Sequence, residues 1–294
     1  MIRIDLHIHS KEGSDGRWHL KEIFKEASLK GITLISITDH DSVSSQKAAA
    51  GLAEKYGMSY VTGIELNVTF NHQEFTKGKD ISLDFLGYGF DPDNKKLVSK
   101  LAELSSHRGK RALMILENLN RELSKEGKGL LSEDDIRKIQ DGVEGAIGRP
   151  HIADYLVEKG MVAGRQEAFD RYLVRLNVPK MLLLIEEASL LIRGAGGLLF
   201  LAHPDDPNGT SLRAVSDDLS RQQQAIKSSM LDYIDGIECW HSRLTGKATD
   251  SYLAFARRHS LLVSGGSDCH QQPVLMGSLE IPAFVAEEFG IKSF

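Results

Sequence analysis

The chain has 294 residues, a formal net charge of −5 and 41% hydrophobic residues. This length fits one barrel of about 250 residues with an insertion better than it fits two equal domains. The net negative charge argues against broad attraction to double-stranded DNA or to an anionic membrane. An anionic substrate must therefore be held locally, by metals and a few arginines.

Cysteine content and hydropathy indicate the compartment. The two cysteines, Cys239 and Cys269, form no spaced pair of the kind that holds zinc, and two thiols alone are weak evidence for a disulfide. The chain starts without a basic segment followed by an apolar stretch, and no run approaches about 18 apolar residues. We therefore expect a cytoplasmic protein without a membrane span, and we infer no obligate protein partner.

Strands and helices alternate in the first third of the chain. Apolar runs and helical spacing predict strands at 2–6, 33–38 and 58–64, with helices at 20–30 and 44–56 between them. Gly31 and Gly57 follow the two helices as stop signals. This order is typical of a parallel α/β fold.

The pattern of apolar and polar residues changes twice further along the chain. Residues 67–90 contain shorter β-like pieces, including an alternating strand at 81–86. From residue 94 to about 187 the spacing is helical, with a long leucine-striped helix at 97–123 and shorter helices after Ser132, Pro150 and Gly164. A helix at 185–193 and strands near Gly197, Tyr233 and Leu261 follow. We expect a barrel from residues 1–93 and 186–294, and an inserted helical subdomain at 94–185 that covers the active site.

Potential metal ligands follow five of the predicted strands. They are His7 and His9, Asp39 and His40, Glu65, His203, and Asp268 and His270. One histidine after a strand is more often an ordinary hydrogen-bonded residue than a ligand. Recurrence at five strand ends is different, because a buried imidazole or carboxylate costs stability unless it is paired or metallated. The pattern predicts a polynuclear metal hydrolase. Asp39 has two readings: it could orient His40, or it could cap the following helix.

The donor set indicates the metal and its chemistry. Imidazole and carboxylate without thiolate suit Mn²⁺, Fe²⁺ or Zn²⁺, and Mn²⁺ is our first expectation. Two cations about 3.5–4 Å apart could share a water, lower its pKa and direct the resulting hydroxide at phosphorus.

Three pairs of side chains away from the predicted metal ligands are candidates for binding an anionic substrate. Arg149 and His151 flank Pro150 at a predicted helix start, where backbone N–H groups favour an anion. Arg108 and Arg111 lie one turn apart on the long helix and could contact the same phosphate, although a solvated helix face also explains them. The third pair is His241 and Arg243, which follow a predicted strand.

Taken together, the motifs resemble those of the polymerase and histidinol phosphatase (PHP) family. They are His7-x-His9, Asp15, Thr38-Asp39-His40, Gly63-Ile-Glu65, Leu201-Ala-His203-Pro204 and Ser267-Asp268-Cys-His270. The segment Gly148-Arg149-Pro150-His151, the helical insertion and Gly236-Ile-Glu-Cys-Trp-His-Ser-Arg243 resemble the branch that removes a phosphate from 3′,5′-nucleoside bisphosphates and trims short RNAs. The resemblance implies a distorted (β/α)7 barrel with two or three metals at its C-terminal rim.

The resemblance also implies a ligand set. A first metal would be held by His7, His9, Glu65 and Asp268, and a second by Asp15, His40 and His270. Glu65 would bridge to a third metal that His203 also binds. Many relatives have a histidine where this chain has Asp84, and a carboxylate can still bind a hard cation there. We expect Asp268, His203 and His270 to be catalytic as well.

The expected function is hydrolysis of the 3′-phosphate of 3′,5′-nucleoside bisphosphates, with 5′-to-3′ trimming of short RNA as a related activity. The expected substrates are therefore small phosphorylated nucleotides or short RNA. Two alternatives are a phosphatase for a non-nucleotide metabolite, of the histidinol phosphate type, and a noncatalytic metal-binding or polymerase accessory module.

Overall fold

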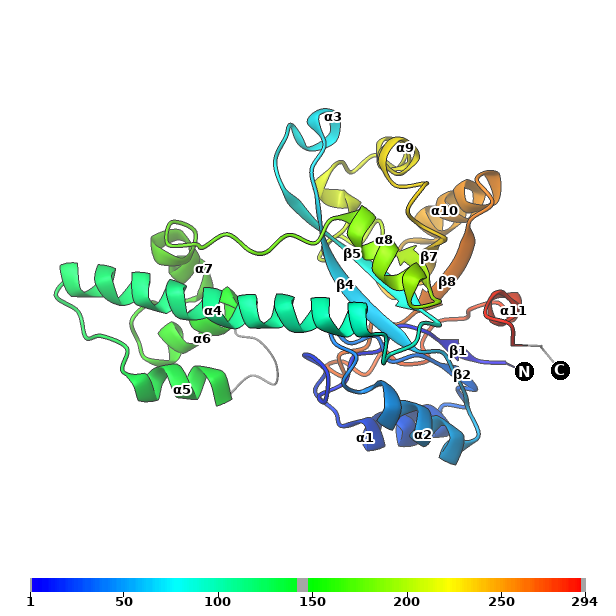
Figure 1. The fold of residues 1–294 in the computed structure, drawn as a ribbon, viewed down its shortest axis with the longest axis horizontal. Coiled ribbons are helices and arrows are strands. Elements are labelled where there is room, and N and C mark those ends of the chain that lie inside the picture. Colours follow the sequence, from blue (N-terminus) through cyan, green and yellow to red (C-terminus); the bar gives the residue numbers. More distant parts are fainter. Residues whose placement is uncertain (1, 142–147, 292–294) are drawn as a thin grey trace. The chain divides into compact units, whose positions relative to one another are not determined.

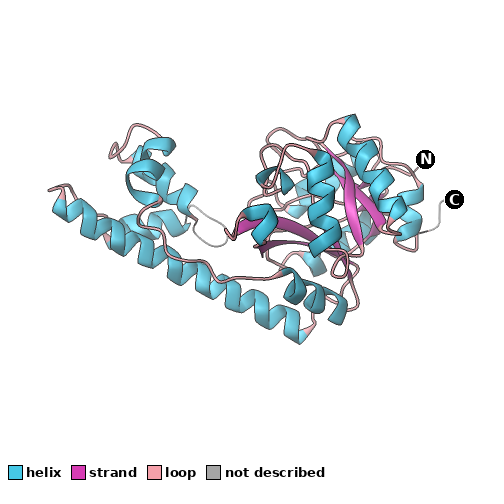
Figure 2. Cartoon of the chain, turned by 90° about the horizontal axis from the view of Figure 1, so that it is seen from above, coloured by secondary structure: helices cyan, strands magenta, loops and turns pink. Residues whose placement is uncertain are grey.

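The computed structural model describes residues 2–141 and 148–291 and has a mixed α/β fold (Figure 1). The chain divides into two compact units. One, which we call the sheet unit, comprises Met1–Val98 and Leu182–Phe294, and the other, the helical unit, comprises Ser99–Met181. Figure 2 shows that the strands belong to the first unit and that the second is built from helices and loops.

The sheet unit begins with three parallel strands. Strands β1 (Ile4–Asp5), β2 (Leu34–Ile35) and β3 (Ser59–Tyr60) are hydrogen-bonded in that order. Helices α1 (Leu20–Leu29) and α2 (Gln46–Tyr56) connect them, as the sequence predicts. The strands are shorter than predicted, but all three lie within the predicted runs.

The second sheet has five strands and is not uniformly parallel. Its order is β4 (Gly63–Phe70), β5 (Ile81–Tyr88), β6 (Leu198–Leu201), β7 (Gly236–His241) and β8 (Leu262–Gly266). Strand β5 is antiparallel to both of its neighbours, whereas β6, β7 and β8 are parallel. The reversal follows from chain length, because the connection between β4 and β5 holds only the short helix α3 (Gln73–Thr76) and is too short for a parallel crossover.

Backbone hydrogen bonds join the two sheets beyond the strand ends. The amide of Leu6 donates to the carbonyl of Gly265 over 3.1 Å, and Ile8 pairs in parallel with Cys269. On the other side, His40 pairs in parallel with Glu65. The segments that follow β1, β2 and β8 therefore meet near Glu65 of β4.

Helices complete the sheet unit. They are α8 (Ile185–Gly194), a 3₁₀ turn η2 (Leu212–Ala214), α9 (Leu219–Ser229), α10 (Gly246–Arg258) and α11 (Phe284–Glu288). Buried apolar residues of α1, α2 and the neighbouring strands form one core cluster, which includes Ile23, Phe24, Ile35 and Ile37. Burial of these side chains holds the helices against the parallel strands.

The helical unit has its own core. The long helix α4 (Lys95–Lys125) enters it, and α5 (Glu133–Asp141), α6 (Arg149–Glu158), α7 (Arg165–Ala168) and the π-helical turn η1 (Phe169–Leu173) follow. Leu116, Leu119, Leu156 and Tyr172 are fully buried in its apolar cluster. A search of the described helices finds none whose length and hydropathy would let it span a membrane.

Candidate metal centre

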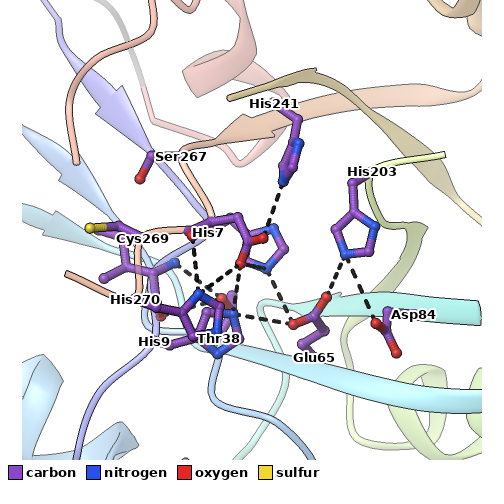
Figure 3. Close-up of polar contacts among 12 residues, drawn as sticks. His7, His9, Thr38, Glu65, Asp84, His203, His241, Ser267, Cys269 and His270 are labelled. Atoms are coloured by element: carbon purple, nitrogen blue, oxygen red, sulfur yellow. Dashed lines mark hydrogen bonds and ion pairs between the residues drawn. The ribbon is translucent and has the colours of Figure 1, made fainter. Parts of the chain in front are cut away.

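Four buried side chains from three separate segments converge at the joint between the two sheets (Figure 3). The imidazole of His9 places its Nε2 3.2 Å from Glu65 Oε2 and 3.2 Å from Asp268 Oδ1. His7 Nε2 lies 3.3 Å from the same Glu65 oxygen and 3.5 Å from the same Asp268 oxygen. Gly266 makes this approach possible, since a Cβ at that position would lie 2.3 Å from the His7 backbone nitrogen.

The atoms at the centre of this group lack hydrogen-bond partners. Within the described part of the chain, His7 Nε2, His9 Nε2 and Glu65 Oε2 are buried and accept or donate no hydrogen bond. Buried polar atoms are normally paired, so a set of three pointing into one space fits a shared cation. Imidazole nitrogen and carboxylate oxygen are suitable donors for a divalent metal.

A second group lies closer to solvent. Asp15, His40 and His270 gather with His9, and the nearest contact joins His270 Nε2 to Asp15 Oδ1 over 3.2 Å. His9 lies between the first two groups, because its Nδ1 is 3.8 Å from Asp15 Oδ1. The Asp15 side chain is 58% exposed, and those of His40 and His270 are 32% and 31% exposed. The interactions with His270, His40 and His9 outweigh burial and hold the pKa of Asp15 below its usual range.

A third group forms around the other oxygen of Glu65. His203 Nε2 lies 2.9 Å from Glu65 Oε1 and 4.0 Å from Asp84 Oδ2 (Figure 3). Asn67 donates to Asp84 Oδ1 over 2.7 Å, and the Thr210 hydroxyl donates to its other oxygen. Burial and the nearby charge of Glu65 raise the pKa of Asp84 to about 8. A bound cation would oppose this effect by favouring the carboxylate.

The imidazoles of His9 and His203 lie in a strongly negative environment, whereas burial lowers the pKa of His40. Burial alone would lower the pKa of His9, but Asp268 and Glu65 outweigh it and raise that pKa to about 10. The pKa of His203 is raised to about 9 against burial, chiefly by Glu65. Excess negative charge in a buried cluster is the electrostatic condition that a divalent cation would satisfy.

Two of the converging residues have unusual backbone conformations. His203 follows β6 with φ +23°, and Asp268 follows β8 with φ +52°. Positive φ values cost energy in residues other than glycine and concentrate at functional sites. The chain turns sharply at these two points, directly after each strand.

Two carboxylates contribute to the site in ways that the sequence did not suggest. Glu238, in the middle of β7, lies 3.0 Å from His7 Nδ1 and accepts the backbone N–H of His203 over 2.8 Å. Asp39 accepts hydrogen bonds from the hydroxyls of Ser10, Ser14 and Ser45, and so fastens the loop that carries Asp15. The available signal for Glu238 was a charged residue between Ile237 and Cys239 in an apolar strand.

His241 and Arg243 lie against the centre and pair with its carboxylates. His241 Nε2 is 3.3 Å from Asp268 Oδ2, and the Arg243 guanidinium contacts the same oxygen over 2.5 Å. Arg243 also pairs with Asp206 over 2.6 Å. These contacts hold Asp268 Oδ2, whereas His7 and His9 face Asp268 Oδ1. Contact of His241 or Arg243 with substrate stays a prediction.

The other predicted phosphate-binding residues lie in the helical unit. Partial burial and the charges of Arg149 and Arg108 lower the pKa of Arg111, so the three guanidinium groups are close enough to interact. Arg111 donates to the carbonyl of Val178 and to the side chain of Asn177. His151 accepts the backbone N–H of Gly148 at the start of α6. Arg149 and Arg108 thus lie near Arg111, and contact of these residues with a phosphate stays a prediction.

Known structures and sequences resemble this chain over most of its length. A protein from Bifidobacterium adolescentis, proposed to be a metal-dependent phosphoesterase, superposes with a TM-score of 0.72 at 28% identity and covers 97% of this chain and 94% of its own. An amidohydrolase from Chromobacterium violaceum, with bound sulfate and no metal, gives a TM-score of 0.68 at 26% identity and covers 93% and 90%. Among curated proteins, a 3′,5′-nucleoside bisphosphate phosphatase from C. violaceum is 28% identical over 92% of this chain and 88% of its own. A 5′-3′ exoribonuclease from Haemophilus influenzae is 27% identical over 91% and 90%.

The α/β fold and the buried imidazole–carboxylate groups define the class of metal-dependent phosphoesterases. Residues 5–177 match the PHP domain, and the chain belongs to this family. The protein is therefore a hydrolase of phosphoric esters that uses divalent metal ions.

Proposed function

We propose that this chain hydrolyses the 3′-phosphate of 3′,5′-nucleoside bisphosphates and also trims short RNA from the 5′ end. The observation that carries this proposal is the set of unpartnered buried atoms on His7, His9 and Glu65 in a chain that matches most of the length of the named phosphatase and exoribonuclease. Both named activities break a phosphate ester in a nucleotide, so a single site would serve both.

The proposed metal ligands fall into the three groups described above. His7, His9, Glu65 and Asp268 would hold a first ion, His9, Asp15, His40 and His270 a second, and Glu65, Asp84 and His203 a third. Mn²⁺ is the ion we propose first, with Fe²⁺ and Zn²⁺ as alternatives, since the donors are nitrogen and oxygen. Such ions, when bound, acidify a coordinated water and neutralise charge on phosphoryl oxygens.

Three of these residues are proposed to lie closest to the reaction. Asp268 belongs to the first group, His270 to the second and His203 to the third. The His270 side chain is 31% exposed, so it can be reached from solvent, whereas His203 is almost fully buried. His270 would therefore contact substrate directly, and His203 would orient Glu65 and hold a proton away from solvent.

We propose that the strands close into the distorted seven-stranded barrel that the family resemblance implies. Support comes from the pairing of Ile8 with Cys269 and of His40 with Glu65, which link the two sheets on both sides. With these links, β1, β2 and β4–β8 form a closed circuit, and β3 lies outside it. We also propose that residues 94–185 cover the active site.

We propose Arg108, Arg111, Arg149 and His151 as the groups that recognise the phosphate that is not cleaved. Support comes from the charges of Arg149 and Arg108, which both lie close enough to Arg111 to lower its pKa, because clustered arginines favour a phosphate.

The test is release of phosphate by the Mn²⁺-loaded protein. We expect rapid release from adenosine 3′,5′-bisphosphate and slow release from adenosine 2′,5′-bisphosphate, adenosine 5′-monophosphate and histidinol phosphate. An Asp268→Ala preparation is the control for contaminating phosphatases. Equal rates on all four compounds, or faster release from histidinol phosphate, would overturn the proposed substrate. No release from any of them would also overturn the proposed substrate and would point to a different phosphoric ester.

A further inference from the structure

Glu238 is a fully buried carboxylate that contacts two separate groups of the metal centre. It projects from β7, and its exposed fraction is 0%. Its Oε1 lies 3.0 Å from His7 Nδ1, and its Oε2 accepts the backbone N–H of His203 over 2.8 Å. A buried charge is costly unless it is paired, and these two contacts give each carboxylate oxygen a hydrogen-bond partner.

The first contact determines which nitrogen of His7 is available. An ionised carboxylate can only accept, so His7 Nδ1 must carry the hydrogen in the bond to Glu238. In the neutral imidazole, Nε2 then keeps its lone pair. Nε2 is the atom that points toward Glu65 and Asp268 and has no hydrogen-bond partner among the residues described.

The second contact fixes an unusual turn. His203 has φ +23°, a conformation that a histidine rarely adopts, and its N–H is bound by Glu238 at that turn. The same turn brings His203 Nε2 to within 2.9 Å of Glu65. Loss of the acceptor would leave a buried backbone N–H unpaired and would loosen the turn.

We infer that Glu238 is a positioning residue that sets the tautomer of His7 and the backbone of His203, so that one carboxylate aligns donors of both the first and the third group. This inference rests on the ligand set in the proposed function. Carboxylates that hydrogen-bond a ligating imidazole tune metal affinity, and their loss typically lowers that affinity about 10- to 100-fold.

Glu238→Gln separates this role from simple space filling, because glutamine has nearly the same shape. The backbone N–H of His203 can only donate, so the amide oxygen of the glutamine must face it. The amide NH₂ must then face His7 Nδ1, which forces His7 to accept there and to carry its hydrogen on Nε2. His7 in this tautomer cannot bind a metal through Nε2.

The experiment measures Mn²⁺ binding by calorimetry and metal content in wild type, Glu238→Gln and Glu288→Gln. Glu288 is the matched control, since its carboxylate accepts a backbone N–H from Val263 and forms no hydrogen bond with a proposed ligand among the residues described. We expect Glu238→Gln to weaken one Mn²⁺ by about 10- to 100-fold, with the control unchanged. Wild-type affinity in a folded Glu238→Gln would overturn the inference.

Amide hydrogen exchange of metal-free protein tests the second contact. We expect the His203 amide to stay protected in Glu238→Gln and to exchange faster in Glu238→Ala, where the acceptor is lost. Unchanged protection in Glu238→Ala would remove the backbone role, and if that variant does not fold, the Mn²⁺ result with glutamine decides alone.

His9→Ala separates this inference from the proposed function: if His9→Ala keeps every Mn²⁺, the ligand set itself fails. If His9→Ala loses Mn²⁺ and Glu238→Gln does not, only the role of Glu238 fails.

Discussion

The sheet unit and the helical unit use charged residues in opposite ways. In the sheet unit, imidazoles and carboxylates are buried at the strand ends, and four of their atoms have no hydrogen-bond partner in the described structure. In the helical unit, charged residues lie mainly on the surface in pairs such as Arg165 with Asp154 and Arg137 with Asp134. Exposed pairs contribute little to stability, whereas buried unpaired groups reduce it.

This difference indicates that the sheet unit carries the reaction site. A folded protein retains buried, strained and unpartnered donors at a stability cost, which is the pattern expected of a functional site. The clustered arginines Arg108, Arg111 and Arg149 are only half-buried, and their like charges suit recognition of an anion. Substitutions in the sheet unit should therefore affect metal binding and turnover, and substitutions in the helical unit should affect substrate affinity.

The largest expected effect follows Asp268→Ala. Removal of a carboxylate shared by His7, His9 and Arg243 should abolish Mn²⁺ binding in the first group and reduce kcat by several orders of magnitude with the fold intact. Steady-state kinetics and circular dichroism check this expectation. Asp217→Ala, at an exposed residue paired with Arg213, is the control. Substantial turnover in the Asp268 variant would place the chemistry elsewhere.

A smaller effect is expected for Arg149→Ala. Loss of one charge-assisted hydrogen bond of about 1.5–3 kcal/mol should raise KM for a 3′,5′-bisphosphate roughly 10- to 100-fold, with little change in kcat. KM for a 5′-monophosphate should change less. Arg137→Ala is the matched control, since Arg137 is exposed and paired with Glu133 and Asp134. Equal effects on both substrates would exclude Arg149 from recognition of the second phosphate.

The smallest expected effect is on the pH dependence of stability. In metal-free protein the pKa of His9 is raised from 6.5 to about 10 and that of His203 from 6.5 to about 9. The native state therefore holds protons that the unfolded chain releases, and the resulting stability is complete below pH 6.5 and is lost as the pH rises through 9 and 10. The unfolding temperature in EDTA should fall from about pH 7 to about pH 9.

Added Mn²⁺ should weaken or reverse this decrease of the unfolding temperature with pH, because metal binding requires deprotonated ligands. Thermal unfolding with EDTA and with Mn²⁺ across this range measures both effects. A flat profile in EDTA would mean that the imidazoles do not share a buried negative environment.

The sequence predicted those features that depend on local pattern. Apolar runs followed by His9, His40 and Glu65 predicted that metal donors would follow the strands. The parallel strands β1, β2 and β3 lie within these runs. The strand predicted at 81–86 is confirmed as β5, but its antiparallel direction was not predicted, because alternation of side chains is the same in both strand directions.

The partners of charged residues could not be predicted for a different reason. Arg243 pairs with Asp206 and Asp268, which lie 37 and 25 residues away, and Glu238 reaches His7 across 231 residues. Such contacts depend on how the sheets join and leave no local signature. A lone carboxylate in an apolar strand indicates that a buried partner exists, but it does not identify the partner.

The anchoring of the loop at residues 10–15 by Asp39 affects how the outermost ion would be exchanged. Three hydroxyls converge on this carboxylate, and Gly13 lies so close that a Cβ there would be 2.1 Å from it. Asp15 is thus open to water and carried on a loop that hydrogen bonds to Asp39 hold in place. Little conformational entropy remains to be lost on capture. Departure of that ion would then be governed by competition from water at Asp15 rather than by opening of the loop.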